Sequence, residues 1–526
     1  MNESGRAHAL GVALALVLAL VLSAPVLDLV PLWDGRIYAL CAQQLARGDL
    51  EGLRCAGHPT HAWSLWMSLA PRLAFGSAPL FHLGSLALFA LLLDGTARVL
   101  RRALPGEDHR PLRLAALGAV AVHPALLATM LNTNPDLGVA AFAMAALGQL
   151  AERRWWVAAA AGSAAAFSKE TGIAVYGLFA LLVVAVEWRV LTPRARRSLV
   201  VLVLPVALAI GVAAARLLGG AAAVWDGAAT DGTGLVNISI SPSDPFLHNA
   251  LALIFVLGFG WLVTLPILAD GFVALRAWAR GAPARPLEGA DATWAALVPA
   301  ALLFGVAGLT SLRTYGNVRY YAPLYPLLVT TGAIALVRLG VPHRLRPVVT
   351  AVWIVTFGAA AWRSVDPVSR MVWGTFPVGP RPMYHMTSVT GECCGRGRDQ
   401  LAYNLEFAFF HEAQNRIFAA VSPTPETVVI VPQGALWFLG APLDPATRRR
   451  TMAWENVLLP RYLDDATLAR TDPLPPEILV LAMPNLPFRP GSPVWARYEV
   501  VEQVEVAAFG HAMHAFRLRR RDDTKR

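Results

Sequence analysis

The stretch WDGRIYALCAQQLARGDLEGLRCAGHPT, residues 33–60, follows directly after the first long apolar run of the chain. It places Asp34 where a helix embedded in lipid would leave the bilayer, and His58 comes later in the same stretch. An ionisable group at a membrane boundary marks a functional-site candidate. The stretch therefore predicts a site at the end of the first membrane span.

The composition around this stretch is that of a membrane protein. Hydrophobic residues make up 56% of the chain and charged residues 15%, against about 25% charged residues in a typical soluble domain. The apolar residues form blocks long enough to cross about 30 Å of hydrocarbon. The net charge of +10 comes from arginines clustered between those blocks, which indicates topology signals rather than a nucleic-acid surface.

The apolar blocks predict an α-helical polytopic protein with about eleven transmembrane helices in residues 1–362. The predicted spans are 8–30, 77–97, 112–131, 137–151, 155–168, 172–189, 199–218, 248–275, 293–311, 321–337 and 347–362. A cleaved signal peptide is the alternative for the first span, although its apolar run continues to Leu32.

Residues 35–75 read as amphipathic interfacial helices, broken by Gly57, Pro59 and Pro71. These helices are expected to form the groove that admits a lipid chain; packing on the membrane surface is the alternative. Cys41 and Cys55 share this region, which leaves a disulfide between them open.

Arginine distribution sets the orientation. With the N-terminus in the cytoplasm, the arginine-rich connections at 98–113, 153–154, 189–197, 276–285 and 338–346 all fall on the cytoplasmic side. An odd number of spans then places the C-terminus outside. We expect an integral protein of a bacterial inner membrane with an extracytoplasmic C-terminal domain.

Residues 363–526 predict that domain, because they lack a long apolar run. A helical periodicity covers 401–421, and 427–431 and 477–483 read as short buried strands. Residues 498–510 and 511–519 predict a β-hairpin. The expected fold is a small α/β domain that helps to bind an acceptor or acts as a stabilising cap.

Few charged residues remain at the predicted outer boundary, and Lys169 is the most informative of them. The chain has only two lysines, Lys169 and Lys525, among 45 basic residues, so a compact ammonium at this position indicates a specific requirement. The full set of site candidates is Asp34, His58, Asp136, Lys169, Glu170, Arg313, Arg319 and Tyr320.

Several of these residues also have a purely structural interpretation. Asp34 and Asp136 could each cap a helix. Lys169 and Glu170 could form a local ion pair, and Arg319, beside Tyr320, could anchor the chain at the membrane interface. His58 could have a purely structural role.

Five short motifs in order resemble the GT-C superfamily of membrane glycosyltransferases, in particular its protein O-mannosyltransferase and aminoarabinose-transferase branch. They are WDGRIY at 33–38, GHPTHAW at 57–63, NPD at 134–136, SKETG at 168–172 and RYYAPLYP at 319–326. The resemblance covers most of residues 1–340. It implies a polyprenyl-phosphate-linked sugar donor, transfer on the extracytoplasmic face, Asp34 as catalytic carboxylate and Asp136 as a second acidic site residue.

Two departures from the family limit what the resemblance implies. The first loop has no DxD motif, which argues against a metal-dependent site of the oligosaccharyltransferase type. A divalent cation stays open but is not indicated, and no other cofactor is predicted. The C-terminal domain carries no family signature, so the acceptor, whether lipid, glycan or protein, is not implied.

The chemistry of such a transfer suits these residues. A sugar phosphate already carries a good leaving group, so the reaction needs a base for the acceptor hydroxyl and cations for the departing phosphate. Asp34 fits the base, and Lys169, Arg313 and Arg319 fit the phosphate site. Direct attack predicts inversion at the anomeric carbon.

Two other classes of function remain as alternatives. A transporter or flippase of a lipid-linked substrate would carry ionisable residues near the bilayer midplane. A non-catalytic scaffold would leave Asp34, Lys169 and Arg319 scattered in space.

Overall fold

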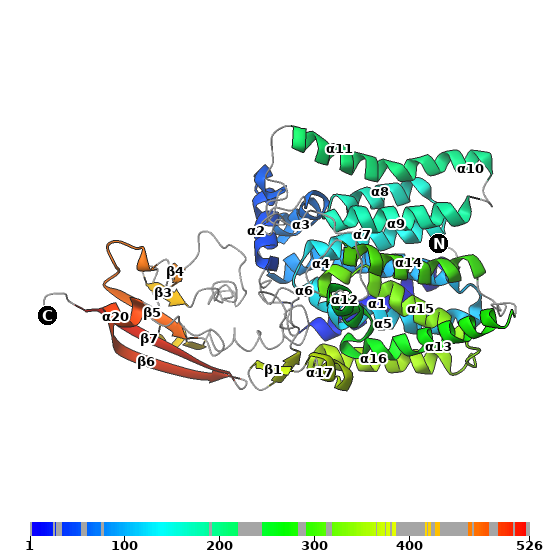
Figure 1. Ribbon diagram of the computed structural model, residues 1–526. Coiled ribbons are helices and arrows are strands. Elements are labelled where there is room, and N and C mark those ends of the chain that lie inside the picture. Colours follow the sequence, from blue (N-terminus) through cyan, green and yellow to red (C-terminus); the bar gives the residue numbers. More distant parts are fainter. Residues whose placement is uncertain are drawn as a thin grey trace.

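The computed structural model of the chain describes residues 3–24, 27, 34–53, 60–74, 78–188, 192–218, 245–281, 291–311, 318–363, 366–373, 375–378, 381–384, 416–417, 419–421, 427–431, 461–464, 468–482, 493–508 and 511–521. A helical bundle and a small β-sheet unit form its two parts (Figure 1).

Each predicted span overlaps a helix of the bundle. The long helices are α1 (Glu3–Ser23), α4 (Ala78–Ala103), α5 (Arg110–Ala121), α6 (Pro124–Leu131), α7 (Pro135–Ala151), α8 (Trp155–Ala166), α9 (Glu170–Glu187), α11 (Leu204–Leu218), α12 (Pro245–Phe255), α13 (Gly260–Ala279), α14 (Ala292–Ser311), α15 (Leu324–Arg338) and α16 (Arg346–Arg363). In the part of the chain that the structure describes, five helices are long and apolar enough to cross a membrane, or six if α5 and α6, bent by 49°, count as one span. The number of eleven spans therefore stays a prediction.

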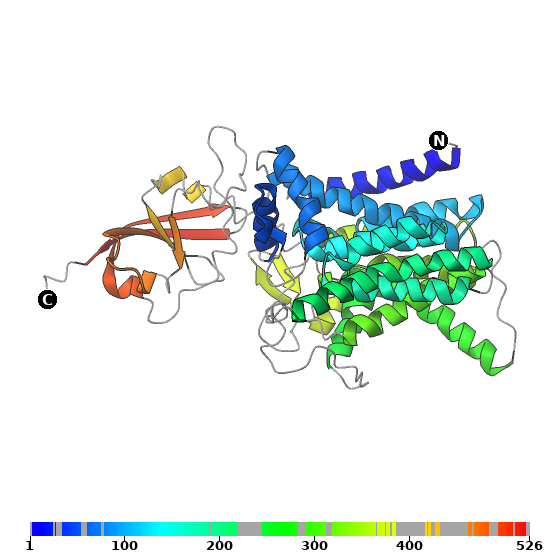
Figure 2. The same cartoon turned by 90° about the horizontal axis from the view of Figure 1, so that it is seen from above.

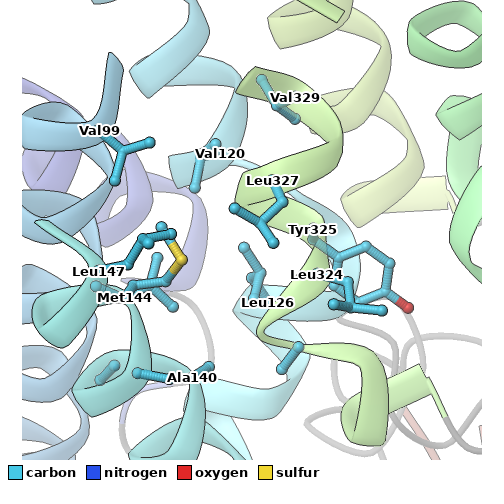
Figure 3. Close-up of a cluster of buried hydrophobic side chains, with 14 of the residues drawn as sticks. Val99, Val120, Leu126, Ala140, Met144, Leu147, Leu324, Tyr325, Leu327 and Val329 are labelled. Atoms are coloured by element: carbon cyan, nitrogen blue, oxygen red, sulfur yellow. The ribbon is translucent and has the colours of Figure 1, made fainter. Parts of the chain in front are cut away.

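The core of the bundle lies around α7, of which every residue except Gln149 is buried. Ala140, Met144 and Leu147 of α7 lie in a cluster with residues of α4, α6 and α15 (Figure 3). The backbones of α4 and α7 approach closely, because a Cβ atom on Gly95 would lie 2.3 Å from the carbonyl oxygen of Met144. Small residues at such a crossing are typical of helix packing in lipid, where close backbone contact replaces the hydrophobic effect.

The prediction of one continuous helix over 248–275 is wrong. Gly258 and Phe259 adopt left-handed φ angles of 60° and 67° and separate α12 from α13. The carboxylate of Asp366 accepts hydrogen bonds from the Phe259 backbone N–H at 2.9 Å and the Trp261 indole N–H at 3.2 Å. These bonds satisfy donors that the break exposes, so the segment after α16 holds the break in place.

One end of the bundle is crossed by α2 (Asp34–Ala46), followed by η2 (Leu50–Leu53) and α3 (His61–Ala74). Both views show α2 lying across the helix ends on the side of the sheet unit (Figures 1 and 2). The predicted interfacial helices thus correspond to α2 and α3. The predicted break at Pro71 is wrong, since α3 continues through that residue to Ala74; a proline removes one helix hydrogen bond without having to end the helix.

The opposite end of the bundle is tied by ion pairs between arginines and carboxylates. Glu152, after α7, binds Arg98 of α4 at 2.6 Å and also Arg101. Arg102 pairs with Asp291 at 3.1 Å before α14, and Arg338 with Asp270 at 3.4 Å between α15 and α13. Asp136 and Glu152 bracket α7, which at 1.5 Å per residue puts them about 24 Å apart. That spacing is close to the thickness of the hydrocarbon core.

The β-sheet unit has five strands in the order β4-β3-β5-β7-β6. The strands are β3 (Val428–Val431), β4 (Arg461–Asp464), β5 (Glu477–Ala482), β6 (Tyr498–Ala508) and β7 (His511–Arg520). β3 lies parallel to β4 and β5, whereas β6 and β7 form the predicted antiparallel hairpin. The two predicted buried strands are confirmed as β3 and β5, and β4 was not predicted.

The connection from the bundle to the sheet contains α17 (Pro367–Trp373) and a small hairpin of β1 (Thr375–Val378) and β2 (Arg381–Tyr384). The helix predicted over 401–421 lies mostly outside the described residues, although 416–417 and 419–421 are helical. The domain boundary at residue 362 stays a prediction.

The crossing of α4 and α7 yields a stability prediction. We expect Gly95→Ala to lower the free energy of unfolding by about 1–3 kcal/mol, because the new methyl group meets backbone that cannot rotate away. Gly271→Ala is the matched control, since no described atom other than its own and those of the adjacent backbone of α13 lies within 4 Å of a Cβ atom there. Thermal unfolding of both variants in detergent tests this; equal midpoints would contradict the close crossing.

Candidate functional site

Asp136 lies in the first turn of α7 and is only 2% exposed. Pro135 occupies the first helical position, and the N-cap residue is Asn134, so Asp136 is not the cap. Its Oδ1 accepts a hydrogen bond from Lys169 Nζ at 2.9 Å, and its Oδ2 lies 3.5 Å from Arg319 Nε. One carboxylate therefore holds two cations that are far apart in the sequence.

Lys169 lies in the turn between α8 and α9 in an extended conformation. The turn is tight, because a Cβ atom on Gly172 would lie 1.9 Å from the carbonyl oxygen of Ala165. This close approach directs the chain so that the lysine, 4% exposed, reaches Asp136. Asp136 is thus a long-range partner of Lys169. Glu170 lies half-buried in the first turn of α9.

Arg319 lies in η7 (Val318–Tyr321), the short helix that leads into α15. Tyr325 of α15 donates a hydrogen bond from its hydroxyl to the Val318 carbonyl at 3.1 Å, which fixes η7 on α15. Arg319 is 3% exposed and is therefore a buried residue rather than an anchor at the lipid surface.

Tyr320 contacts both cations. The centre of its ring lies 4.3 Å from Lys169 Nζ and 5.3 Å from the guanidinium carbon of Arg319. The face of an aromatic ring attracts a cation, more strongly where water is excluded. The ring therefore helps Asp136 to keep two positive groups close together.

The charge of Lys169 is maintained by its neighbours. Burial lowers the pKa of the ammonium, but Asp136, Tyr320 and Tyr38 outweigh that effect and hold the pKa above its usual value. An ammonium has three N–H donors, and one of them serves Asp136. Among the described residues no second hydrogen bond of this ammonium is seen, so two donors of a charged group can serve a further acceptor such as a phosphate oxygen.

Tyr38 connects α2 to the Asp136 cluster. It is 2% exposed; burial raises the pKa of its phenol, and the charges of Lys169 and Arg319 act to lower it. Trp63 of α3 packs edge-to-face on Tyr38 at 5.7 Å. Sequence reasoning missed Tyr38, although its place one helical turn after Asp34 on an amphipathic helix was a usable signal.

Asn134 is a second residue that sequence reasoning missed. It is fully buried, and within the described part of the chain neither its side-chain oxygen nor its nitrogen has a hydrogen-bond partner. The preceding Thr133, also fully buried, has a left-handed φ of 47°. Unsatisfied buried amides and left-handed non-glycine residues are both uncommon and concentrate at functional sites. The letters NTNPD gave the only sequence signal.

The structure brings four of the candidates, Asp136, Lys169, Arg319 and Tyr320, together, and their roles stay predictions. Asp34 is the first residue of α2, but its side chain lies outside the description, as do the whole of His58 and Arg313. The described residues contain no group of three or more His, Cys, Asp or Glu side chains that could hold a metal ion.

Comparison with known proteins gives a fold relationship. No protein-family model and no curated protein matches the chain. The structure of ArnT from Cupriavidus metallidurans bound to undecaprenyl phosphate is similar, with a TM-score of 0.52, 14% identity and coverage of 98% of both chains. The oligosaccharyltransferase AglB from Archaeoglobus fulgidus, in complex with an inhibitory peptide and a dolichol-phosphate, matches 68% of this chain and 58% of its own. Its identity is 11%, and its TM-score of 0.37 is too low to bear on the fold. The chain therefore has the fold of the ArnT structure.

Proposed function

We propose that this protein is a GT-C-type glycosyltransferase that moves a sugar from a polyprenyl-phosphate-linked donor to an acceptor hydroxyl. The observation that carries the proposal is the convergence of Lys169, Arg319 and Asp136, from three separate turns, beneath α2. The similar ArnT structure is bound to a lipid phosphate, and two buried cations beside an interfacial helix suit that chemical group.

Lys169 and Arg319 are proposed to hold the donor phosphate, with Arg313 as a further cation. As the bond to the anomeric carbon breaks, negative charge grows on the departing phosphate, and fixed cations in a water-poor site stabilise it. Asp136 acts by positioning both cations, since each of its oxygens faces one of them. The Asn134 amide is suited to a hydroxyl of the sugar.

Asp34 is proposed as the base that takes the proton of the acceptor hydroxyl, and direct attack then inverts the anomeric carbon. The position of Asp34 in the chain supports this role. Asp34 is the first residue of α2, the helix that carries Tyr38, and Tyr38 interacts electrostatically with Lys169 and Arg319. The base would thus lie about one helical turn from Tyr38 on α2.

The site is proposed to face the extracytoplasmic side. The arginine-rich helix connections lie at the opposite end of the bundle, as the positive-inside rule requires for a cytoplasmic face. In addition, Cys41 of α2 is disulfide-bonded, with its partner outside the described residues. Stable disulfides form in oxidising compartments outside the cytosol. The sheet unit lies at this same end (Figure 1) and is suited to present an acceptor.

The location of the charges favours a transferase over a transporter. Asp136, Lys169 and Arg319 lie at helix ends, whereas transporters place their coupling residues near the bilayer midplane.

Replacing the proposed base tests the reaction. We expect Asp34→Asn to reduce transfer at least about a hundredfold, since a positioned base contributes about 10²–10⁴-fold. Cells lacking the protein are complemented with wild-type or variant chain, and their envelope glycans and glycoproteins are compared by mass spectrometry. Asp49→Asn, an exposed carboxylate after α2, is the control. Full transfer by Asp34→Asn would rule out this base.

The ion pair predicts non-additive stability. Removing either partner of a buried pair leaves the other charge uncompensated, at a cost of about 3–5 kcal/mol. We therefore expect Asp136→Asn with Lys169→Gln to be less destabilising than the sum of the two single changes. Thermal unfolding of the wild type, the two single variants and the double variant measures the coupling. Repeating it with undecaprenyl phosphate shows whether Lys169→Gln is no longer stabilised by the lipid. Additive effects would contradict the pair.

The pH dependence of the coupling follows from the raised pKa of Lys169. Because the pKa of Lys169 is higher in the folded protein than its ordinary value of 10.5, its charge stabilises the fold fully at any pH below 10.5. This stabilisation is lost only as the pH rises above that value. We expect the coupling to be constant between about pH 6 and 9. A decline within that window, measured by the same unfolding cycle, would show that Lys169 is not held in its charged form.

A further inference from the structure

A second polar site lies at the end of the bundle opposite Asp136. A cavity of about 230 Å³ opens between α1, the end of α4 and the beginning of α5. Its polar lining comprises His8, Arg101, Glu107, Arg110 and Arg113. The proposed transferase mechanism uses none of these residues.

Three arginines and one carboxylate, Glu107, line the cavity. Arg113 lies within electrostatic range of Glu107 and of both Arg101 and Arg110. Arg110 faces Glu107 at 3.7 Å, but this pair is exposed and weak. Arg113 forms no ion pair within the described residues; its NH1 group donates instead to the carbonyls of Leu104 and Gly106 at 2.7 and 2.6 Å.

Other acidic groups near the cavity already have basic partners. Asp94 binds His8 at 2.7 Å and Arg98 at 2.7 Å. Glu152 binds Arg98 and Arg101. The remaining positive charge therefore lies on Arg110 and Arg113, which outnumber the one nearby carboxylate, Glu107. The carbonyl contacts of Arg113 hold its guanidinium in place at the cavity.

Apolar surface adjoins the cavity. Leu10 and Leu14 of α1 are each 58% exposed, and Leu114 of α5, which lines the cavity, is 41% exposed. α1 approaches α5 at Gly11, where a Cβ atom would lie 2.8 Å from a methyl carbon of Leu114. A basic hollow beside exposed leucines matches an amphipathic ligand with an anionic head and apolar chains.

We propose that this cavity binds the phosphate headgroup of an anionic phospholipid, with its acyl chains along the exposed faces of α1 and α5. Arginines that only set the orientation of the chain must lie on the same side of the membrane, but they need not line one cavity. Basic pockets between membrane helices on the cytoplasmic side are suited to anionic headgroups.

Lipid binding to the full-length protein tests the proposal. Protein in neutral detergent is titrated with phosphatidylglycerol or phosphatidylcholine, and bound lipid is counted by native mass spectrometry. We expect a single tight phosphatidylglycerol site and at least a tenfold preference over phosphatidylcholine. Excess inorganic phosphate should displace little lipid, because it lacks the chains. Equal binding of both lipids, or complete displacement by phosphate, would overturn the lipid assignment.

Variants locate the site. Arg110→Gln with Arg113→Gln should weaken phosphatidylglycerol binding roughly thirtyfold, at about a factor of five for each basic residue. Arg344→Gln, an exposed arginine at the turn between α15 and α16, should bind as the wild type does. Arg110→Gln alone leaves the carbonyl contacts of Arg113 intact and should weaken binding about fivefold even if the double variant is unstable. Unchanged binding by Arg110→Gln, or an equal loss in Arg344→Gln, would overturn the site.

Discussion

Burial of charge at the ends of helices constrains this structure more than any other feature. Asp136, Lys169 and Arg319 are each nearly inaccessible to solvent. A charge buried here without a partner would lower the stability of the folded protein by several kcal/mol. Their mutual contacts therefore require the turn before α7, the turn between α8 and α9, and η7 to meet at one point. The geometry of this site therefore depends on how the helices next to these three segments pack together.

The packing of the bundle supplies that placement. α7 is buried almost all round and contacts α4 where Gly95 permits backbone contact. Asp136 and Glu152 bracket this helix, so a single rigid element links the polar cluster at one end to the arginine network at the other. Tyr38 of α2 lies within electrostatic range of Lys169 and Arg319, so α2 lies beside this cluster.

The two ends of the bundle use charge in different ways. At one end, buried cations surround a single carboxylate beneath an interfacial helix, an arrangement suited to chemistry on a lipid phosphate. At the other end, the ion pairs of Glu152, Asp291 and Asp270 join neighbouring helices, while Arg110 and Arg113 line a cavity. This asymmetry agrees with the side on which each arginine falls along the sequence.

The sequence alone determined the membrane class, the places of the helices, the hairpin of the sheet unit and the shared side of Asp136, Lys169 and Arg319, because apolar length and arginine placement are local properties. It could not determine that α12 and α13 are separate, since Asp366, more than a hundred residues away, caps that break. Nor could it show that Asp136 bridges both cations, that Tyr38 lies within their electrostatic range or that Asn134 is buried at the start of α7. Those contacts depend on how helices cross, and the crossing is set by close approaches such as that at Gly95, which only the tertiary structure shows.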